Sequence, residues 1–478
     1  MRWEGRFMGL DEFLETMSGQ IRSSKARIMA RQEMEDHIRD QAEAYEDSGM
    51  TRTEAMDQAI RQMGDPVTAG VELDRIHRPK MEWRLFTWII LFSILGLAIQ
   101  YVCFYGFSQA RPQEALQGSM GNFMRQCVYT AIGLGVMAMV CLCDYSMIGR
   151  WAGILGGIFL GAVWLACKSG VLGRINGSYP YLKCLTYLFV PLYAGILYRN
   201  RGKGYMGLGV SVLWIWMLML IGIGGIGGGI GVTIDALLTC GFLLFVAAWQ
   251  EWFGLPRKAG AGVLMIFLIT AVSLFIIRLA PYQSSRIQMY LHPEDFENTG
   301  GYQIVNIRNI VSNLSFNGSS YGVLEQKGLA DFLRNLGVYS EFMILQTAVT
   351  LGVMKTACVC VLFALFLMYL FRMAIRQKNQ LGRMMGLGCT LVLTMETVRN
   401  VLSNFGIGFI STGGVPFFSY GKWHTLVVYI LFGVLLSIYR HENLVWDEPA
   451  AASRERGVIG RIGAYVIRVE KRDGRVSQ

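Results

Sequence analysis

The chain has 478 residues, of which 53% are hydrophobic and only 16% are charged, and its formal net charge is +10. Soluble proteins are about 25% charged, so this composition, with a mean hydropathy of +0.38, excludes an ordinary soluble enzyme. Repeated apolar runs near 20 residues long predict a protein with many membrane spans. The ten cysteines lie in or beside apolar runs, which argues against a disulfide framework or a metal site. No nucleic-acid-binding motif is present.

Residues 1–80 are polar and highly charged, without a cleavable signal peptide, and their apolar spacing predicts a small domain of four helices. Thr51-Arg52-Thr53-Glu54 predicts a capping box at the third helix, and Asp65-Pro66 predicts the start of the fourth. The segment resembles the short cytoplasmic helical prefix (HAAS-like) that is fused to some permeases. This resemblance implies a docking or regulatory module, and the alternative is a helical bundle that merely folds.

Ten membrane-spanning helices are predicted after Trp83. They cover 85–107, 126–147, 151–171, 180–198, 205–223, 226–248, 259–280, 342–371, 384–404 and 423–440. The run at 342–371 is longer than a bilayer requires, so we expect it to begin as a helix outside the membrane. The predicted fold is therefore an all-α transmembrane bundle over 83–440.

Lysine and arginine placement predicts that both termini are cytoplasmic, which makes 281–340 a large extracellular loop between spans seven and eight. Residues 441–478 form a basic cytoplasmic tail, which we expect to contact the anionic lipids of the inner leaflet. A short hairpin is predicted around Asp473-Gly474.

Residues 412–421, Thr-Gly-Gly-Val-Pro-Phe-Phe-Ser-Tyr-Gly, lie between the last two apolar runs. Three glycines, a proline and a serine disfavour a helix, yet three aromatic residues disfavour exposure to water. Irregular backbone at membrane depth persists only against protein or a wet cavity. We therefore predict a packed, re-entrant or cavity-lining loop, with an ordinary surface turn as the alternative.

This loop resembles the Thr-Gly…Pro-Phe-x-Ser-Tyr-Gly signature of the SEDS (shape, elongation, division, sporulation; FtsW/RodA/SpoVE) family of bacterial membrane proteins. Further words of the family's pattern occur in the same order. They are Arg125-Gln126, Asp144-Tyr145, Gly173-Arg174-Ile175-Asn176-Gly177, Arg286-Ile287, Leu291-His292-Pro293 and Gly301-Tyr302-Gln303-Ile304. The resemblance covers nearly all of 85–440 and implies the same ten-span layout in the bacterial plasma membrane.

The resemblance implies a peptidoglycan glycosyltransferase that polymerises a lipid-linked disaccharide (lipid II-like) carried on undecaprenyl pyrophosphate. It also implies a class B penicillin-binding protein (transpeptidase) or a divisome or elongasome protein as partner, and it leaves a divalent cation open as cofactor. The family's catalytic Asp, in a Thr-Asp-Phe triplet, aligns with Glu341 in Ser340-Glu341-Phe342. Glu341 is thus the candidate base, and the alternative is a glutamate that favours a helix N-terminus through the helix dipole.

The predicted substrate-binding residues are Arg125, Arg174, Arg286, Ser419, Tyr420, Lys422, Asn400 and Glu396, with no metal ligand. Polar family elements are replaced at 188–192, 227–231, 312–315 and 349–350. These departures favour a non-catalytic scaffold or regulator that binds a transpeptidase or divisome partner. A third possibility is a flippase for the lipid-linked precursor, because the glycines around 222–231 permit close helix packing or a broken helix.

Ionisable residues inside membrane spans are candidates for function. Glu396 and Arg399 are three positions apart in span nine, a spacing that allows an ion pair on one helix face. Asp235 and Lys355 also lie within apolar runs, and Lys355 with Arg278 is a candidate for neutralising a lipid pyrophosphate. For each, the alternative is a structural role in helix packing.

Overall fold

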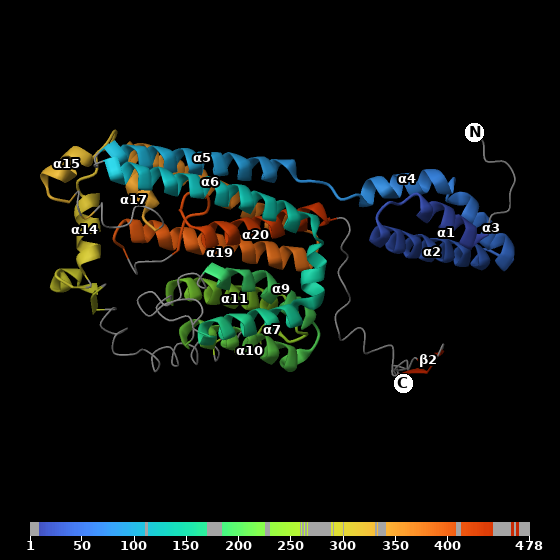
Figure 1. The fold of residues 1–478 in the computed structure, drawn as a ribbon. Helices are drawn as coiled ribbons and strands as arrows, with labels where there is room; N and C mark the ends of the chain where they lie inside the picture. Colours follow the sequence, from blue (N-terminus) through green and yellow to red (C-terminus); the bar gives the residue numbers. More distant parts are fainter. Residues whose placement is uncertain are drawn as a thin grey trace. The chain divides into compact units, whose positions relative to one another are not determined.

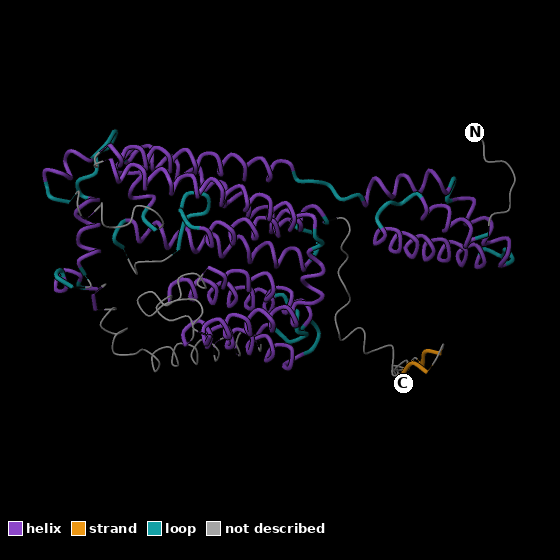
Figure 2. Tube along the Cα trace, viewed as in Figure 1, coloured by secondary structure: helices purple, strands orange, loops and turns teal. Residues whose placement is uncertain are grey.

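The computed structural model describes residues 9–109, 113–169, 184–224, 230–258, 288–289, 291–299, 301–329, 341–407, 413–442, 460–462 and 465–467, with 260, 262, 265 and 332. The chain divides into two compact units. The first comprises Met1–Met81 with Tyr439–Trp446, and the second comprises Glu82–Ile438 with Asp447–Gln478. Helices make up almost all of the described chain (Figure 2).

The first unit contains four helices. They are α1 (Leu10–Gly19), α2 (Ser24–Asp47), α3 (Arg52–Gln62) and α4 (Pro66–His77). Its core joins Phe13, Leu14 and Met17 of α1 to apolar side chains of α2 and α3. The predicted capping box of Thr51 and Glu54 is present at α3. This unit therefore has a hydrophobic core of its own.

The second unit is a helical bundle. The helices of the bundle are α5 (Trp83–Gln109), α6 (Gln113–Leu142), α7 (Tyr145–Ser169), η1 (Cys184–Leu188), α9 (Phe189–Arg199), α10 (Gly204–Gly224), α11 (Ile230–Trp249), α17 (Met343–Leu351), α18 (Val353–Arg376), α19 (Gln380–Asn404) and α20 (Lys422–Arg440). Further elements are η2 (Pro293–Phe296), α14 (Tyr302–Val311) and α15 (Tyr321–Gln326), and an antiparallel strand pair, β1 (Gly460–Ile462) and β2 (Tyr465–Ile467).

Within the described residues, six helices are long and apolar enough to cross a membrane: those at 83–105, 120–142, 145–169, 204–221, 353–376 and 422–440. Shorter apolar helices lie at 184–199 and 234–249. The predicted seventh span, 259–280, lies almost wholly outside the described residues. These helices indicate a multi-pass membrane protein.

Helix α19 packs inside the second unit. It packs against α18, α9 and α11, and it also contacts α17 and α7; Figure 1 shows α9 and α11 next to it. Most of its side chains between Leu381 and Asn404 are buried. Polar residues on α19 therefore lie inside the bundle.

The long run predicted at 342–371 is two helices in the structure. Gly352 separates α17 from α18 with a φ of +92°, a conformation that glycine adopts without steric cost. The backbone around Phe316 lies against this break, and the Met354 N–H donates to the Phe316 carbonyl. A Cβ at Gly352 would lie 2.8 Å from Asn317 Cα. The glycine at the break thus allows the backbone at 316–317 to pass close to the junction of α17 and α18.

The 288–329 segment, the described part of the predicted extracellular loop, packs on α17. Ile307, Ile310 and Leu324 share a core with Phe342 and Leu345. Helices α14 and α15 lie at one end of the bundle, beside α17 (Figure 1). Helix α17 is therefore held between this segment and the bundle.

The 288–329 segment contains a buried phenol, and the tail contains a strand pair. Burial raises the pKa of the Tyr321 phenol to about 12. The strand pair joins 460–462 to 465–467, and the hairpin predicted around Asp473-Gly474 lies outside the described residues.

Candidate functional site

The loop 413–421 is packed inside the bundle, as its composition predicts. Gly413–Ser419 is buried throughout. The Gln100 side chain of α5 donates to the Phe418 carbonyl at 2.9 Å, and Gly96 leaves room for the Phe417 carbonyl, which would lie 2.2 Å from an added Cβ. The aromatic rings of the loop pack on rings of α5, α18 and α20, namely Phe92, Phe363 and Phe432.

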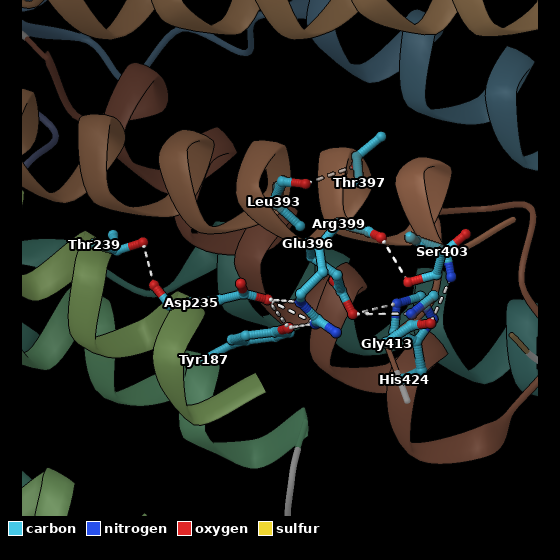
Figure 3. Close-up of polar contacts among 12 residues, drawn as sticks. Tyr187, Asp235, Thr239, Leu393, Glu396, Thr397, Arg399, Ser403, Gly413 and His424 are labelled. Atoms are coloured by element: carbon cyan, nitrogen blue, oxygen red, sulfur yellow. Dashed lines mark hydrogen bonds and ion pairs between the residues drawn. The ribbon is translucent and has the colours of Figure 1, made fainter. Parts of the chain in front are cut away.

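Two residues of α19 hold this loop from inside the bundle. Glu396, which is fully buried, accepts a hydrogen bond from Gly414 N–H at 3.1 Å. Asn400 donates from Nδ2 to the Gly413 carbonyl at 2.7 Å. His424 Nε2 lies 3.2 Å from Glu396 Oε1 (Figure 3). The loop is therefore bound to α19 through its backbone and, at His424, through the start of α20.

Glu341 is half-buried and stands immediately before α17. The N-cap position, Phe342, offers no capping side chain. Instead Asn404 Oδ1 accepts from Leu345 N–H at 2.9 Å, while Asn400 Nδ2 and Asn404 Nδ2 donate to the Glu341 carbonyl at 2.9 and 3.0 Å. The backbone of Glu341 is thus fixed by two side chains of α19.

The pairing predicted between Glu396 and Arg399 is wrong. Arg399 Nη2 instead lies 2.6 Å from Asp235 Oδ2 on α11, and the Tyr187 hydroxyl donates to the same oxygen at 3.0 Å. Glu396 faces His424 and the loop (Figure 3). The i,i+3 spacing allows Glu396 and Arg399 to pair on one helix, but in the packed bundle each side chain has a partner on another element. Both side chains are desolvated there, and a buried charge without a partner is costly.

Four other predicted substrate-binding residues lie in the described part of the chain. Arg125 is exposed on α6 and donates to Asn122. Ser419 is buried, and its hydroxyl accepts from the Val415 N–H within the loop. Tyr420 is half-exposed and Lys422 exposed, while Lys355 is exposed on α18. Arg174, Arg286 and Arg278 lie outside the described residues.

A cavity of about 430 Å³ lies between α17, α18, α19, α5 and the loop. Its walls are almost entirely apolar, and Glu341, Ser419 and Arg125 are not among the lining residues. Representative lining residues are Met343, Ile344, Phe363, Val401, Val415 and Phe418. Such a cavity suits a hydrocarbon chain better than a sugar or a pyrophosphate.

The described part of the chain contains no group of three or more His, Cys, Asp or Glu side chains that could hold a metal ion. The ten cysteines, all of which lie in the described part of the chain, are thiols and form no disulfide. A divalent cation therefore stays a prediction without a described ligand set.

Sequence reasoning missed His424, Tyr187 and Asn404. The spacing of Glu396, Asn400 and Asn404, four positions apart along α19, is a signal that could have identified Asn404, because such residues share one face. Nothing in the sequence pattern assigns partners to His424 or Tyr187, since both contacts join elements distant in the chain.

The fold and the buried polar face of α19 define a multi-pass α-helical membrane protein. Residues 84–444 match the family model FTSW_RODA_SPOVE, described as cell cycle protein, and the chain belongs to this family. The resemblance drawn from the loop signature is thereby confirmed.

Relatives and a solved structure agree with this assignment. The chain is 23% identical over 369 residues to the probable peptidoglycan glycosyltransferase FtsW of Geobacter sulfurreducens, covering 72% of this chain and 94% of that one. It is 25% identical over 216 residues to the peptidoglycan glycosyltransferase MrdB of Escherichia coli, covering 45% and 56%. A chain from a peptidoglycan synthase complex has the same fold, with a TM-score of 0.56, 19% identity, and coverage of 76% and 98%.

Proposed function

We propose that this protein is a peptidoglycan glycosyltransferase that polymerises a lipid-linked disaccharide at the outer face of the bacterial plasma membrane. The observation that carries the proposal is the position of Glu341. Glu341 directly precedes Phe342, the N-cap residue of α17, and Met343 and Ile344, the first two residues of that helix, line the apolar cavity. An acidic residue two positions before a cavity-lining residue suits a substrate with a sugar head and a lipid tail.

In this reaction Glu341 acts as general base. It removes the proton from a sugar hydroxyl as that oxygen forms a bond to the anomeric carbon of a second sugar, and the bond from this carbon to the pyrophosphate oxygen breaks. The proton passes to the carboxylate, and the lipid pyrophosphate leaves. The names of the FtsW and MrdB relatives support this activity.

The cavity supplies the lipid subsite of the proposal. Its lining is apolar on α18 and α19, at residues such as Leu367 and Val401, so it suits a prenyl chain. Arg125, Arg174, Arg286 and Lys422 are the proposed contacts for the pyrophosphate, because cations neutralise phosphate charge.

The topology is proposed with the activity. It has ten spans, both termini in the cytoplasm, 281–340 outside, and the basic tail against anionic lipids of the inner leaflet. A class B penicillin-binding protein is the proposed partner, supported by the fold shared with a chain of a peptidoglycan synthase complex. The helical unit at residues 1–81 is proposed to dock a cytoplasmic partner.

The test is polymerisation of a fluorescent lipid-linked disaccharide by the full-length protein in liposomes, with a divalent cation, resolved on a gel. Glu341→Ala should lower the rate by about 100- to 10,000-fold, as expected for loss of a general base. Glu297→Ala is the matched control, since Glu297 is an exposed glutamate of the 288–329 segment. Equal rates for both variants would remove Glu341 from the mechanism.

A second candidate function is a non-catalytic scaffold of the same fold. It is favoured by the absence of Glu341 and Ser419 from the lining of the apolar cavity and by the engagement of Glu396 and Asn400 with the loop backbone. This scaffold would polymerise nothing, yet it would still co-purify with a transpeptidase. The same gel assay, with co-purification measured in parallel, separates the two functions.

A further inference from the structure

We propose that Asn400 and Asn404 form a clamp that positions Glu341, an inference that rests on the proposed glycosyltransferase function. Both side chains are 1% exposed, on the α19 face that also carries Glu396. Between them they bind the Glu341 carbonyl, the N-terminus of α17 and the loop 413–421. Neither residue touches substrate in this role; they are positioning residues.

All side-chain N–H groups of Asn400 and Asn404 donate hydrogen bonds within the protein. Asn400 Nδ2 uses both protons, on the carbonyls of Glu341 at 2.9 Å and Gly413 at 2.7 Å. Asn404 Nδ2 donates to the Glu341 carbonyl at 3.0 Å and to Asn400 at its carbonyl and Oδ1. Because every amide proton has an acceptor, neither side chain has an N–H left to donate to a ligand in this arrangement.

Asn404 also caps α17 from another helix. A helix N-terminus has backbone N–H groups without intrahelical partners, and a side chain of the N-cap residue usually accepts one of them. Phe342 has no side-chain acceptor, so Asn404 Oδ1 accepts from Leu345 N–H instead, at 2.9 Å. The start of α17, and with it Glu341, is therefore fixed relative to α19.

The clamp requires a carboxamide. An amide accepts through oxygen and donates through nitrogen, and Asn404 does both at once, toward Leu345 and Glu341. A protonated carboxylic acid also offers one acceptor and one donor, whereas an ionised carboxylate only accepts and would face the Glu341 carbonyl with like polarity. The variant Asn404→Asp should therefore work only while its introduced carboxyl is protonated.

The experiment uses full-length protein in nanodiscs and liposomes, with a fluorescent lipid-linked disaccharide as substrate. Asn404→Leu should lower kcat on the order of 100-fold, as a displacement of about 1 Å does at a catalytic group, while KM stays unchanged. Asn404→Asp should keep activity at acidic pH and lose it as pH rises, over a range in which the unmodified protein does not lose it. Thr390→Val is the control, because it removes a buried hydroxyl of α19 that has no hydrogen-bond partner.

Hydrogen–deuterium exchange supplies a readout independent of the reaction. The amides of residues 343–346 should exchange faster in Asn404→Leu than in Thr390→Val, because the Leu345 N–H loses its acceptor. Unchanged exchange, or unchanged kcat while Glu341→Ala abolishes polymer, overturns the clamp and leaves the proposed function intact. If the unmodified protein makes no polymer, the proposed function fails and exchange alone decides the clamp. If Asn404→Leu does not accumulate, a flat pH profile of Asn404→Asp overturns it.

Discussion

The buried contact between Asp235 and Arg399 offers a quantitative test of how the bundle is held together. Two nitrogens of Arg399, Nε and Nη2, lie 2.8 and 2.6 Å from Asp235 Oδ2. The side chains are only 15% and 5% exposed. Removing one partner of a buried pair leaves an uncompensated charge, at a cost of about 3–5 kcal/mol.

We therefore expect Asp235→Leu and Arg399→Met each to lower the free energy of unfolding by about 3–5 kcal/mol. The double variant should be close to the unmodified protein, because replacing a whole buried pair by apolar groups of similar volume is often neutral or stabilising by about 1–4 kcal/mol. The two effects are then strongly non-additive, which is the sign of direct coupling.

The assay is reversible unfolding by SDS titration in mixed micelles, followed by tryptophan fluorescence. A matched control is the pair of Arg308 and Glu294, whose Nη1 and Oε1 atoms are 3.1 Å apart but whose side chains are 43% and 69% exposed. An exposed pair contributes only about 0–1 kcal/mol. Single variants of the buried pair that cost no more than those of the control, or a double variant as unstable as the singles, would refute the reasoning.

Two further predictions concern the loop and the first unit. Gly96→Ala should destabilise the bundle by about 1–3 kcal/mol through overpacking, because the added Cβ would lie 2.2 Å from the Phe417 carbonyl oxygen. Gly135→Ala is the control, because a Cβ added there has no atom within 4 Å. Equal melting temperatures of the two variants would contradict the close contact. Thr51→Ala should destabilise a fragment of residues 1–81 by about 1 kcal/mol through loss of the N-cap, measured by urea unfolding. Hydrogen bonds from Thr51 lower the pKa of Glu54. Ionised Glu54 therefore stabilises the fold at pH values above its unfolded pKa, and this contribution is lost as pH falls through the folded pKa. In Thr51→Ala the stability should fall less steeply on the acid side, and an unchanged pH profile of stability would count against the capping box.

Much of the fold followed from local patterns. Apolar runs near 20 residues mark spans because a bilayer fixes the length of a helix that crosses it. The capping box at Thr51 is a contact between residues three apart, so its spacing alone defines it. The break at Gly352 was not predicted, because the apolar pattern continues across it. The positive φ of Gly352 is explained only by the close approach of the Phe316 backbone.

The candidate site was predicted less completely. Glu341 and Asn400 were identified through a family signature, but their relation was not, because the hydrogen bond between them joins residues 59 positions apart. Glu396 and Arg399 were recognised as unusual inside a membrane span, yet the partner expected for each was wrong. The ion-pair partner of a charged residue in a bundle is the opposite charge nearest to it in three dimensions. An i,i+3 spacing shows only that two residues lie on the same face of one helix.

The sequence by itself determined a multi-pass helical membrane protein of this family, a packed loop at 413–421 and an acid at position 341. These features depend on apolar length, backbone preference and residue identity, all of which are local. Only the tertiary structure decided that Asn404 caps α17, that His424 meets Glu396 and that Asp235 meets Arg399. Such contacts depend on which helices pack together, and hydrophobic burial sets that packing without specifying in advance which polar groups will meet.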